Sequence, residues 1–333
     1  MICLGIESTA HTFGVGVLER NGCTKILSDA KDVYKAKMGS GIHPREASRH
    51  HAETCGYVFG NALQQAGVTI KDIDFVSYSA GPGLGPCLRV GAVVARAISS
   101  YYAKPLVPTN HAIGHIELGK ILCGIKDPLV LIVSGGHTAL AAKLGEDWRI
   151  FGETLDLTLG QLIDQLGRFL GMSSPAGPEI EKLALDGSKE ESAKSILTRL
   201  PYTIKGNDVS YSGLLSASKD LFTEGASRES ICYAVQELAF SILAEATERA
   251  LAFTDKKELL VTGGVAANQR LASLLVLMCS KRGVKVGVIP RQFAGDCGSQ
   301  IAAAGFAFYD RGDIVSPANA YVRQSWRLDQ VRL

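Results

Sequence analysis

The chain has 333 residues, and 46% of them are hydrophobic, which is enough to bury a sizeable core and to form two domains. Its 35 basic and 33 acidic residues leave a net charge of +2, which gives little indication of a polyanionic partner and is typical of an ordinary soluble protein. None of the eight cysteines stands in a Cys-x-x-Cys pair, which argues against a cysteine zinc cage and against a disulfide framework.

The N-terminus, MICLGIEST, lacks the basic segment and the long apolar core of a signal peptide. No apolar run approaches the roughly 18 residues that a membrane-spanning helix needs. We therefore expect a cytoplasmic protein without a membrane partner.

The first half of the chain predicts a hairpin followed by two strand-helix units. Residues 3–18 contain two apolar runs joined by a Gly/Ser/Thr bend, which is typical of a β-hairpin. Residues 74–85 predict a strand that ends in a glycine turn, and a helix should follow from about Arg89 to Tyr102. The next short strand leads into a helix that begins near Asn110.

The second half repeats this plan. Residues 129–144 again predict a hairpin, and residues 258–271 again predict a strand, a glycine turn and a helix. The last strand leads into a helix that begins near Asp296. We therefore predict an α/β fold of two similar lobes, at 1–125 and 126–333, with a nucleotide and metal cleft between them. A basic helical insertion should occupy about 31–65, and the C-terminal segment is expected to pack back on the first lobe.

Two histidines and one aspartate occupy corresponding places in the two halves. His111 and His115 are four residues apart, so on a helix both rings lie on one face, and Asp296 stands where the second half starts its last helix. If the halves face each other, two imidazoles and one carboxylate meet with open coordination positions, a set that suits Fe(II) or Zn(II). An N-cap role for the aspartate and a packing role for the histidines remain open.

Four glycine-rich bends predict a nucleotide between the lobes. They lie at 7–12, 80–85, 134–138 and 262–268. Such bends expose backbone N–H groups that hold phosphate oxygens, and a following helix start adds its dipole. Neither the P-loop pattern nor the dinucleotide fingerprint occurs, so this is a different kind of nucleotide protein.

Nine motifs together carry a family resemblance over essentially the whole chain. They are GIESTAHT, HPREASRHH, GPGLGPCLRVG, NHAIGH, VSGGHT, SPAGPEIEKLA, SYSGLLSASK, TGGVAANQRL and GDCG. With them the chain resembles the tRNA threonylcarbamoyladenosine transferases, once described as glycoproteases, within the actin-like ATPase superfamily. The first two motifs look archaeal, and the catalytic subunit of the KEOPS complex belongs to this family.

The resemblance implies a metal held by His111, His115 and Asp296, one divalent Fe or Zn ion per subunit. It also implies that threonylcarbamoyl-AMP, ATP or an analogue binds between the lobes. The implied nucleotide-binding residues are Ser134, Gly135, Gly136, His137, Thr138, Asp164, Gly177, Glu181 and Asn268. From the residues alone, the better reading of Asp164 is a solvated helix residue facing Arg168.

Two positions depart from the family pattern. Ile132 stands where archaeal relatives often have a tyrosine that reaches the metal, so no tyrosine ligand is expected here. Cys297 replaces the usual asparagine beside the aspartate ligand, and we interpret it as a small buried residue, although it leaves the identity of the metal open.

The implied reaction moves a threonylcarbamoyl group from threonylcarbamoyl-AMP to the exocyclic amine of the tRNA adenosine that is 3′-adjacent to the anticodon. Basic residues between Lys31 and His51, including Lys37, predict a surface for tRNA phosphates, and a solvated helix face is an equal alternative. The expected partners are a small atypical protein kinase and the small dimerising and regulatory subunits of a KEOPS-type complex.

Three other functions remain possible readings. An actin-like ATPase or a sugar kinase would use the same fold, and so would a nucleotide-switched scaffold. A metallopeptidase is disfavoured, because its helix needs a glutamate after the first histidine and that position is Ala112. Some archaeal relatives carry the kinase fused after the C-terminus, so the chain could also be part of a longer fusion.

Overall fold

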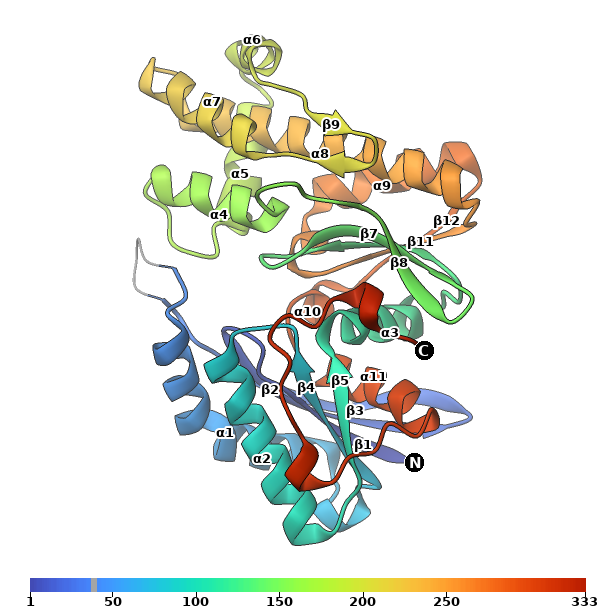
Figure 1. Ribbon diagram of the computed structural model, residues 1–333. Coiled ribbons are helices and arrows are strands. Elements are labelled where there is room, and N and C mark those ends of the chain that lie inside the picture. Colours follow the sequence, from blue (N-terminus) through green and yellow to red (C-terminus); the bar gives the residue numbers. More distant parts are fainter. Residues whose placement is uncertain (37–40) are drawn as a thin grey trace.

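The computed structural model describes residues 1–36 and 41–333, and it contains two five-stranded sheets with the same topology (Figure 1). In each sheet the first three strands are antiparallel neighbours, and the first strand then pairs in parallel with the fourth, and the fourth with the fifth. The first sheet contains β1 (Ile2–Glu7), β2 (Thr12–Asn21), β3 (Cys23–Val33), β4 (Phe75–Gly81) and β5 (Leu106–Asn110). The second contains β6 (Leu129–Val133), β7 (Thr138–Leu144), β8 (Asp147–Glu153), β11 (Glu258–Thr262) and β12 (Lys285–Val288). The predicted duplication and fold class are therefore confirmed.

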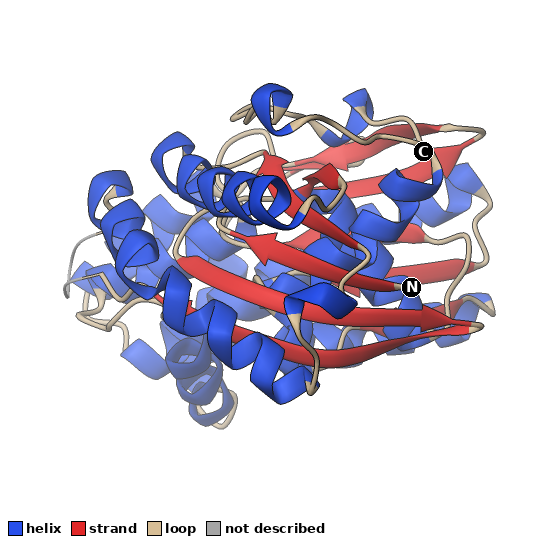
Figure 2. Cartoon of the chain, turned by 90° about the horizontal axis from the view of Figure 1, so that it is seen from below, coloured by secondary structure: helices blue, strands red, loops and turns tan. Residues whose placement is uncertain are grey.

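Helices cover both faces of the two sheets (Figure 2). They are α1 (Pro44–Ala66), α2 (Gly85–Tyr102), α3 (His111–Cys123), α4 (Leu159–Phe169), α5 (Gly177–Gly187), α6 (Glu191–Arg199), α7 (Ser212–Thr223), α8 (Arg228–Thr254), α9 (Gln269–Arg282), α10 (Arg291–Ala294) and α11 (Gly298–Asp310). A short ribbon of β9 (Ile204–Lys205) and β10 (Asp208–Val209), and the 3-10 turns η1 (Ile70–Asp72), η2 (Gly264–Ala267), η3 (Pro317–Asn319) and η4 (Leu328–Gln330), complete the described elements. In the part of the chain that the structure describes, no helix combines the length and apolar character needed to cross a membrane.

The layers follow from the alternation of side chains along each strand. On β1, Gly5 faces α11, whereas Ile6 lies on the opposite face, toward α2. On β6, Leu131 belongs to the apolar core beneath α8 and α9, whereas Ile132 belongs to the core between the sheets. The molecule is therefore a stack of helices, first sheet, helices α3 and α11, second sheet, and helices again (Figure 1).

The last helix of each half packs against the sheet of the other half. Helix α3 follows β5 of the first sheet but contacts β11 and β12 of the second, and α11 follows β12 but packs on β1 and β2 of the first. Glycines allow this close approach, since a Cβ on Gly119 of α3 would lie 2.9 Å from Leu260 of β11. A Cβ on Gly16 of β2 would lie 2.2 Å from the backbone nitrogen of Ser299 in α11. We call this arrangement the helix exchange.

Residues 315–333, here called the C-terminal strap, connect the two lobes. Near its start, the backbone N–H of Arg323 donates to the carbonyl of Ala80 on β4 at 2.6 Å. At its end, the N–H of Leu333 donates to the carbonyl of Glu146 beside β8 at 3.1 Å. Between these points Trp326 is buried in the core that also holds residues of both sheets.

Some predicted boundaries were wrong by a few residues. Helix α2 begins at Gly85 rather than near Arg89, with Pro86 in its first turn, where a missing N–H costs nothing. In the predicted basic insertion, β3 runs on to Val33 and α1 begins at Pro44, while Lys37 lies outside the described residues.

Candidate metal centre

The start of α3 is fixed by its N-cap residue, Asn110. The side-chain oxygen of Asn110 accepts hydrogen bonds from the backbone N–H groups of Ala112 at 2.9 Å and Ile113 at 3.3 Å. Its amide nitrogen donates to the carbonyl of Trp326 in the C-terminal strap at 3.0 Å. His111 therefore occupies the first helical position, and His115 lies one turn further on the same face.

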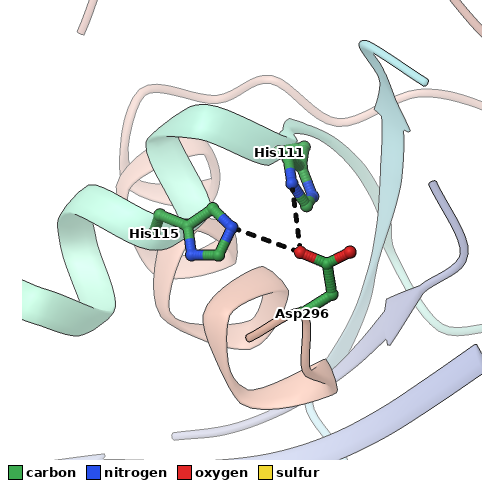
Figure 3. Close-up of side chains that lie close together, drawn as sticks. All are labelled: His111, His115 and Asp296. Carbon is green, nitrogen blue, oxygen red and sulfur yellow. Dashed lines mark ion pairs between the residues drawn. The ribbon is translucent and has the colours of Figure 1, made fainter. Parts of the chain in front are cut away.

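The structure brings Asp296 to these two histidines (Figure 3). Asp296 lies between α10 and α11, and its Oδ1 is 3.5 Å from Nε2 of His111 and 3.4 Å from Nε2 of His115. The two imidazole rings are nearly perpendicular, at 87°, with their centroids 4.8 Å apart. Both histidines are buried, so the three side chains form a sheltered cluster at the point where the helix exchange brings α3 and α11 together.

The oxygen of Asp296 is spaced from each histidine nitrogen as two ligand atoms around one cation would be. Two atoms bound to Zn²⁺ at about 2.0–2.1 Å in tetrahedral geometry lie about 3.3 Å apart. A direct charge-assisted N–H···O bond would bring the same atoms to about 2.7–2.9 Å. Nε2 of His115 is buried and makes no hydrogen bond within the described residues, so its lone pair is available to a metal. The residues present therefore fit a divalent ion.

A carboxylate that sequence reasoning missed supports His111 from behind. Glu7, the last residue of β1, is fully buried, and its Oε2 lies 3.0 Å from Nδ1 of His111. Its Oε1 accepts the backbone N–H and the hydroxyl of Thr9, both at 2.5 Å. One signal was present in the sequence, because a glutamate that ends an otherwise apolar strand needs a partner once it is buried.

The buried charges shift one another's pKa values. Burial acts to lower the pKa of His111, but the charges of Glu7 and Asp296 outweigh it and raise the pKa to about 9. Burial acts to raise the pKa of Asp296, and the two neighbouring histidines instead hold that pKa well below its usual range. Burial, together with His111 and His115, lowers the pKa of His137 to about 4, so His137 is neutral at physiological pH.

The hairpin turn of residues 134–138 lies between β6 and β7. The hydroxyl oxygen of Ser134 accepts hydrogen bonds from the backbone N–H groups of Gly136 at 3.2 Å and His137 at 3.0 Å. The hydroxyl of Thr138 accepts the N–H of Leu159 at 2.7 Å and so ties the turn to the start of α4. Gly135 and Gly136 are exposed. Two N–H groups of the turn are thus bonded to its own serine, and the phosphate-binding nest at 134–138 stays a prediction.

Of the other four predicted nucleotide residues, three form hydrogen bonds to helix ends in the second lobe. Asp164 accepts the N–H of Ala176, just before Gly177 at the start of α5, at 2.9 Å. Glu181 accepts the N–H of Gln269 at 2.7 Å. Asn268 caps α9 through its oxygen. The structure therefore gives three of these side chains a structural role that their assignment to a nucleotide had not included.

Gly177 and Asn268 also line a narrow cavity between α4, α5 and α8. The amide of Asn268 donates to Oε1 of the buried Gln236 there at 3.0 Å. The cavity holds about 10 Å³, roughly the room for one water molecule, so a nucleotide at these residues would have to displace lining side chains.

Two side chains of the predicted basic segment lie beside acidic neighbours. Arg49 lies 3.2 Å from Glu46, and His50 lies 2.9 Å from Asp32. Lys31 instead reaches the cluster, where its ammonium donates to the backbone carbonyl of Asp296 at 3.4 Å.

The two departures from the family pattern are both buried. Ile132 is 1% exposed on β6 and packs in the core between the sheets. Cys297 is fully buried before α11, and burial raises the pKa of its thiol well above the ordinary value. The interpretation of Cys297 as a small buried residue is confirmed.

Fold and cluster together define a two-lobed actin-like α/β protein with a candidate metal centre between its lobes. Among solved structures, HypF from T. kodakarensis superposes with a TM-score of 0.64 over 94% of this chain and 48% of that chain, at 14% identity. Component A of (R)-2-hydroxyglutaryl-CoA dehydratase from Acidaminococcus fermentans gives 0.55 over 93% and 98%, at 13% identity. At these identities the likeness concerns the fold alone.

Sequence relatives identify the family. The family model described as tRNA N6-adenosine threonylcarbamoyltransferase matches residues 25–303. Relatives with this name from Caldivirga maquilingensis and Ignicoccus hospitalis are each 44% identical, over 331 and 336 residues, covering 99% and 100% of this chain and 97% and 99% of theirs. The chain therefore belongs to the tRNA N6-adenosine threonylcarbamoyltransferase family, and its relatives include many archaeal proteins.

Proposed function

We propose that the protein transfers the threonylcarbamoyl group of threonylcarbamoyl-AMP to the exocyclic amine of the tRNA adenosine 3′-adjacent to the anticodon, and that this transfer depends on a divalent metal. Family membership supports the transferase activity. The observation that carries the metal dependence is the cluster of ligand groups from His111, His115 and Asp296, in which the carboxylate oxygen lies 3.5 and 3.4 Å from the two Nε2 atoms.

In the proposed reaction the adenosine amine attacks the carbamoyl carbon, and the bond from that carbon to the AMP phosphate oxygen breaks. Bound metal supplies a Lewis acid for the charge that develops on the acyl oxygen. His111, His115 and Asp296 would hold this metal, and iron and zinc both suit such a ligand set. The exposed turn at Gly135 and Gly136 would offer backbone N–H groups to the departing phosphate, with that of Gly136 exchanging its bond to Ser134 for one to the phosphate.

We further propose that an adenine nucleotide binds between the lobes, on residues of the second lobe. Its phosphate would lie at residues 134–138, and its sugar would lie near Asp164, Gly177, Glu181 and Asn268. The support is that hydrogen bonds join these elements. Asp164 of α4 accepts a bond from the residue before α5, and Glu181 of α5 accepts a bond from the first residue of α9, which Asn268 caps. Binding there would exchange some of these internal hydrogen bonds for bonds to the nucleotide.

The tRNA is proposed to be held jointly with partner proteins, as in a KEOPS-type complex with a small atypical kinase and small dimerising and regulatory subunits. The net charge of +2 is small, and Arg49 and His50 of the basic segment already have acidic neighbours in Glu46 and Asp32. Sequence-independent tRNA affinity depends on neutralising phosphates, so other chains would supply part of it.

A metallopeptidase is a poorer fit to the same geometry. Such an enzyme needs a carboxylate beside its metal-bound water. The residue after the first histidine is Ala112, and the nearby Glu7 bonds Nδ1 of His111, on the side of the ring away from Asp296.

The direct test is nucleoside mass spectrometry of unmodified tRNA incubated with this protein, candidate partner subunits and threonylcarbamoyl-AMP. We expect threonylcarbamoyladenosine to form with the metal-loaded protein and to disappear after chelation, returning when iron or zinc is restored. Modification that persists undiminished in the chelated, metal-free protein would contradict the metal dependence, and absence of modification under all conditions would contradict the transfer itself.

A further inference from the structure

Glu7 is a fully buried carboxylate whose partners lie around a single imidazole nitrogen. Its Oε2 is 3.0 Å from Nδ1 of His111. The side-chain nitrogen of Gln300, from α11, lies 3.4 Å from the same carboxylate oxygen and 3.1 Å from the same imidazole nitrogen. The hydroxyl of Thr9 is 3.3 Å from that nitrogen as well. A buried carboxylate is costly to keep unless it is paired, so this arrangement requires an account.

The position of Glu7 decides which nitrogen of His111 carries a proton. A carboxylate accepts but does not donate, so Nδ1 of His111 must donate to it. Nε2, on the other side of the ring, is then the nitrogen left to bind a metal in exchange for any proton of its own, and it lies 3.5 Å from Oδ1 of Asp296. Histidine ligands of metals are commonly held in this way, by an acceptor on the nitrogen that does not bind the metal.

The second histidine lacks such a support. Nδ1 of His115 is buried and has no hydrogen-bond partner within the described residues. The two imidazoles are therefore unequal, one held by a carboxylate and one held only by packing. Together Glu7 and Asp296 bring two negative charges to the cluster, which is the number that balances one dication.

We infer that Glu7 is a positioning residue that fixes the tautomer and orientation of His111 and supplies the second buried charge for a divalent ion. This inference rests on the metal centre of the proposed function. The first sheet fixes Glu7 itself, since Glu7 pairs with Gly14 of β2 and its carboxylate closes a turn onto Thr9.

Glu7→Gln tests this role, because the amide keeps the shape of the side chain and removes its charge. We expect the affinity for Zn²⁺, measured by competition with a chromophoric chelator, to fall about 10- to 100-fold while far-UV circular dichroism stays unchanged. The matched control is Asp32→Asn, which alters another carboxylate–imidazole pair, with His50 at 2.9 Å. This control should bind Zn²⁺ as the unaltered protein does.

The inference would be overturned if folded Glu7→Gln binds Zn²⁺ as tightly as the parent protein while His115→Ala loses Zn²⁺ binding. The metal centre itself would then still be supported. If His115→Ala binds Zn²⁺ as tightly as the parent protein, both the role of Glu7 and the metal centre would be overturned.

A measurement on the unaltered protein covers the case in which Glu7→Gln does not fold. In zinc-loaded protein with ¹⁵N-labelled histidine, we expect the signals that vanish in His111→Ala to report a metal on Nε2 and a proton on Nδ1. Metal on Nδ1 of His111, or a proton on its Nε2, would overturn the role of Glu7.

Discussion

The ionisable side chains of the cluster are buried, and burying a charge costs free energy. His111 and His115 are both less than a tenth exposed, and Glu7 behind them is not exposed at all. Taking ionisable groups out of water costs free energy unless they are paired, hydrogen-bonded or bound to a metal. A cation shared by His111, His115 and Asp296 would satisfy Nε2 of His115, which makes no hydrogen bond in the described part of the chain.

Asp296→Ala is expected to remove the metal without unfolding the protein. Helix α11 stays attached, because Asp29 accepts both the N–H and the hydroxyl of Ser299 at 2.9 and 2.8 Å. We expect metal content to fall to background and tRNA modification to fall by more than about 100-fold. The control is Asp310→Ala at the other end of α11, which should keep its metal; elemental analysis and nucleoside mass spectrometry measure both effects.

His51 should make stability depend on pH. Burial and the neighbouring His50 and His11 lower its pKa from 6.5 to about 4, so the unfolded chain takes up a proton at a higher pH than the folded one. The contribution of neutral His51 is complete above about pH 6.5 and is lost as the pH falls towards 4.

Replacing His51 with Gln removes this dependence, and in urea unfolding the pH profile of the variant should be flatter by roughly 2 kcal/mol between pH 6.5 and 4. Parallel profiles for the two proteins would show that His51 keeps an ordinary pKa.

At the scale of elements, the contact of α11 with the first sheet depends on glycine. A Cβ on Gly16 would lie 2.2 Å from the nitrogen of Ser299 and 2.5 Å from the carbonyl carbon of Gly298, and backbone atoms cannot rotate away. We expect Gly16→Ala to lower the free energy of unfolding by about 3 kcal/mol or more. Gly60→Ala is the matched change, because Gly60 lies in α1 with nothing within 4 Å of an added Cβ.

Gly60→Ala should raise the free energy of unfolding by about 0.5–1 kcal/mol, since glycine is a poor helix former. Chemical denaturation of both variants compares the two effects, and a Gly16→Ala protein as stable as the parent would mean that α11 does not sit this close to β2.

The repeated elements are what the sequence made predictable. The hairpins at 3–18 and 129–144 have strong local patterns, and their repetition indicated the same fold in each half. The same repetition related Asp296 to the histidines, although nearly two hundred residues separate them. Glu7 escaped prediction because a single glutamate has no periodicity, and its partner is far along the chain.

The hydrogen bonds of Asp164, Glu181 and Asn268 to helix ends were equally invisible, since they depend on how α4, α5 and α9 pack rather than on local pattern.

At the scale of the whole molecule, one apolar core serves both lobes. It contains Phe13 of the first sheet, Ile132 of the second, and Trp326 of the C-terminal strap. Because neither sheet buries its inner face without the other, we expect a single cooperative unfolding transition.

Trp326→Ala should lower the free energy of unfolding by about 3 kcal/mol, because it leaves a cavity in the core that both lobes share. Tyr321→Ala is the control, since that side chain is 67% exposed and its contact with Tyr78 uses only its backbone carbonyl. Two separate transitions in the parent protein, or equal stability of the two variants, would contradict a shared core.

The helix exchange has a consequence for how the chain can be divided. A cut in the turn between Cys123 and Leu129 would leave one fragment with a sheet but without α11, and the other with a sheet but without α3. Each fragment alone would expose a groove shaped for its missing helix, so neither is expected to be a viable unit. Mixed together, they could complement each other, and the metal ligands, contributed by both fragments, would form only in the reassembled pair.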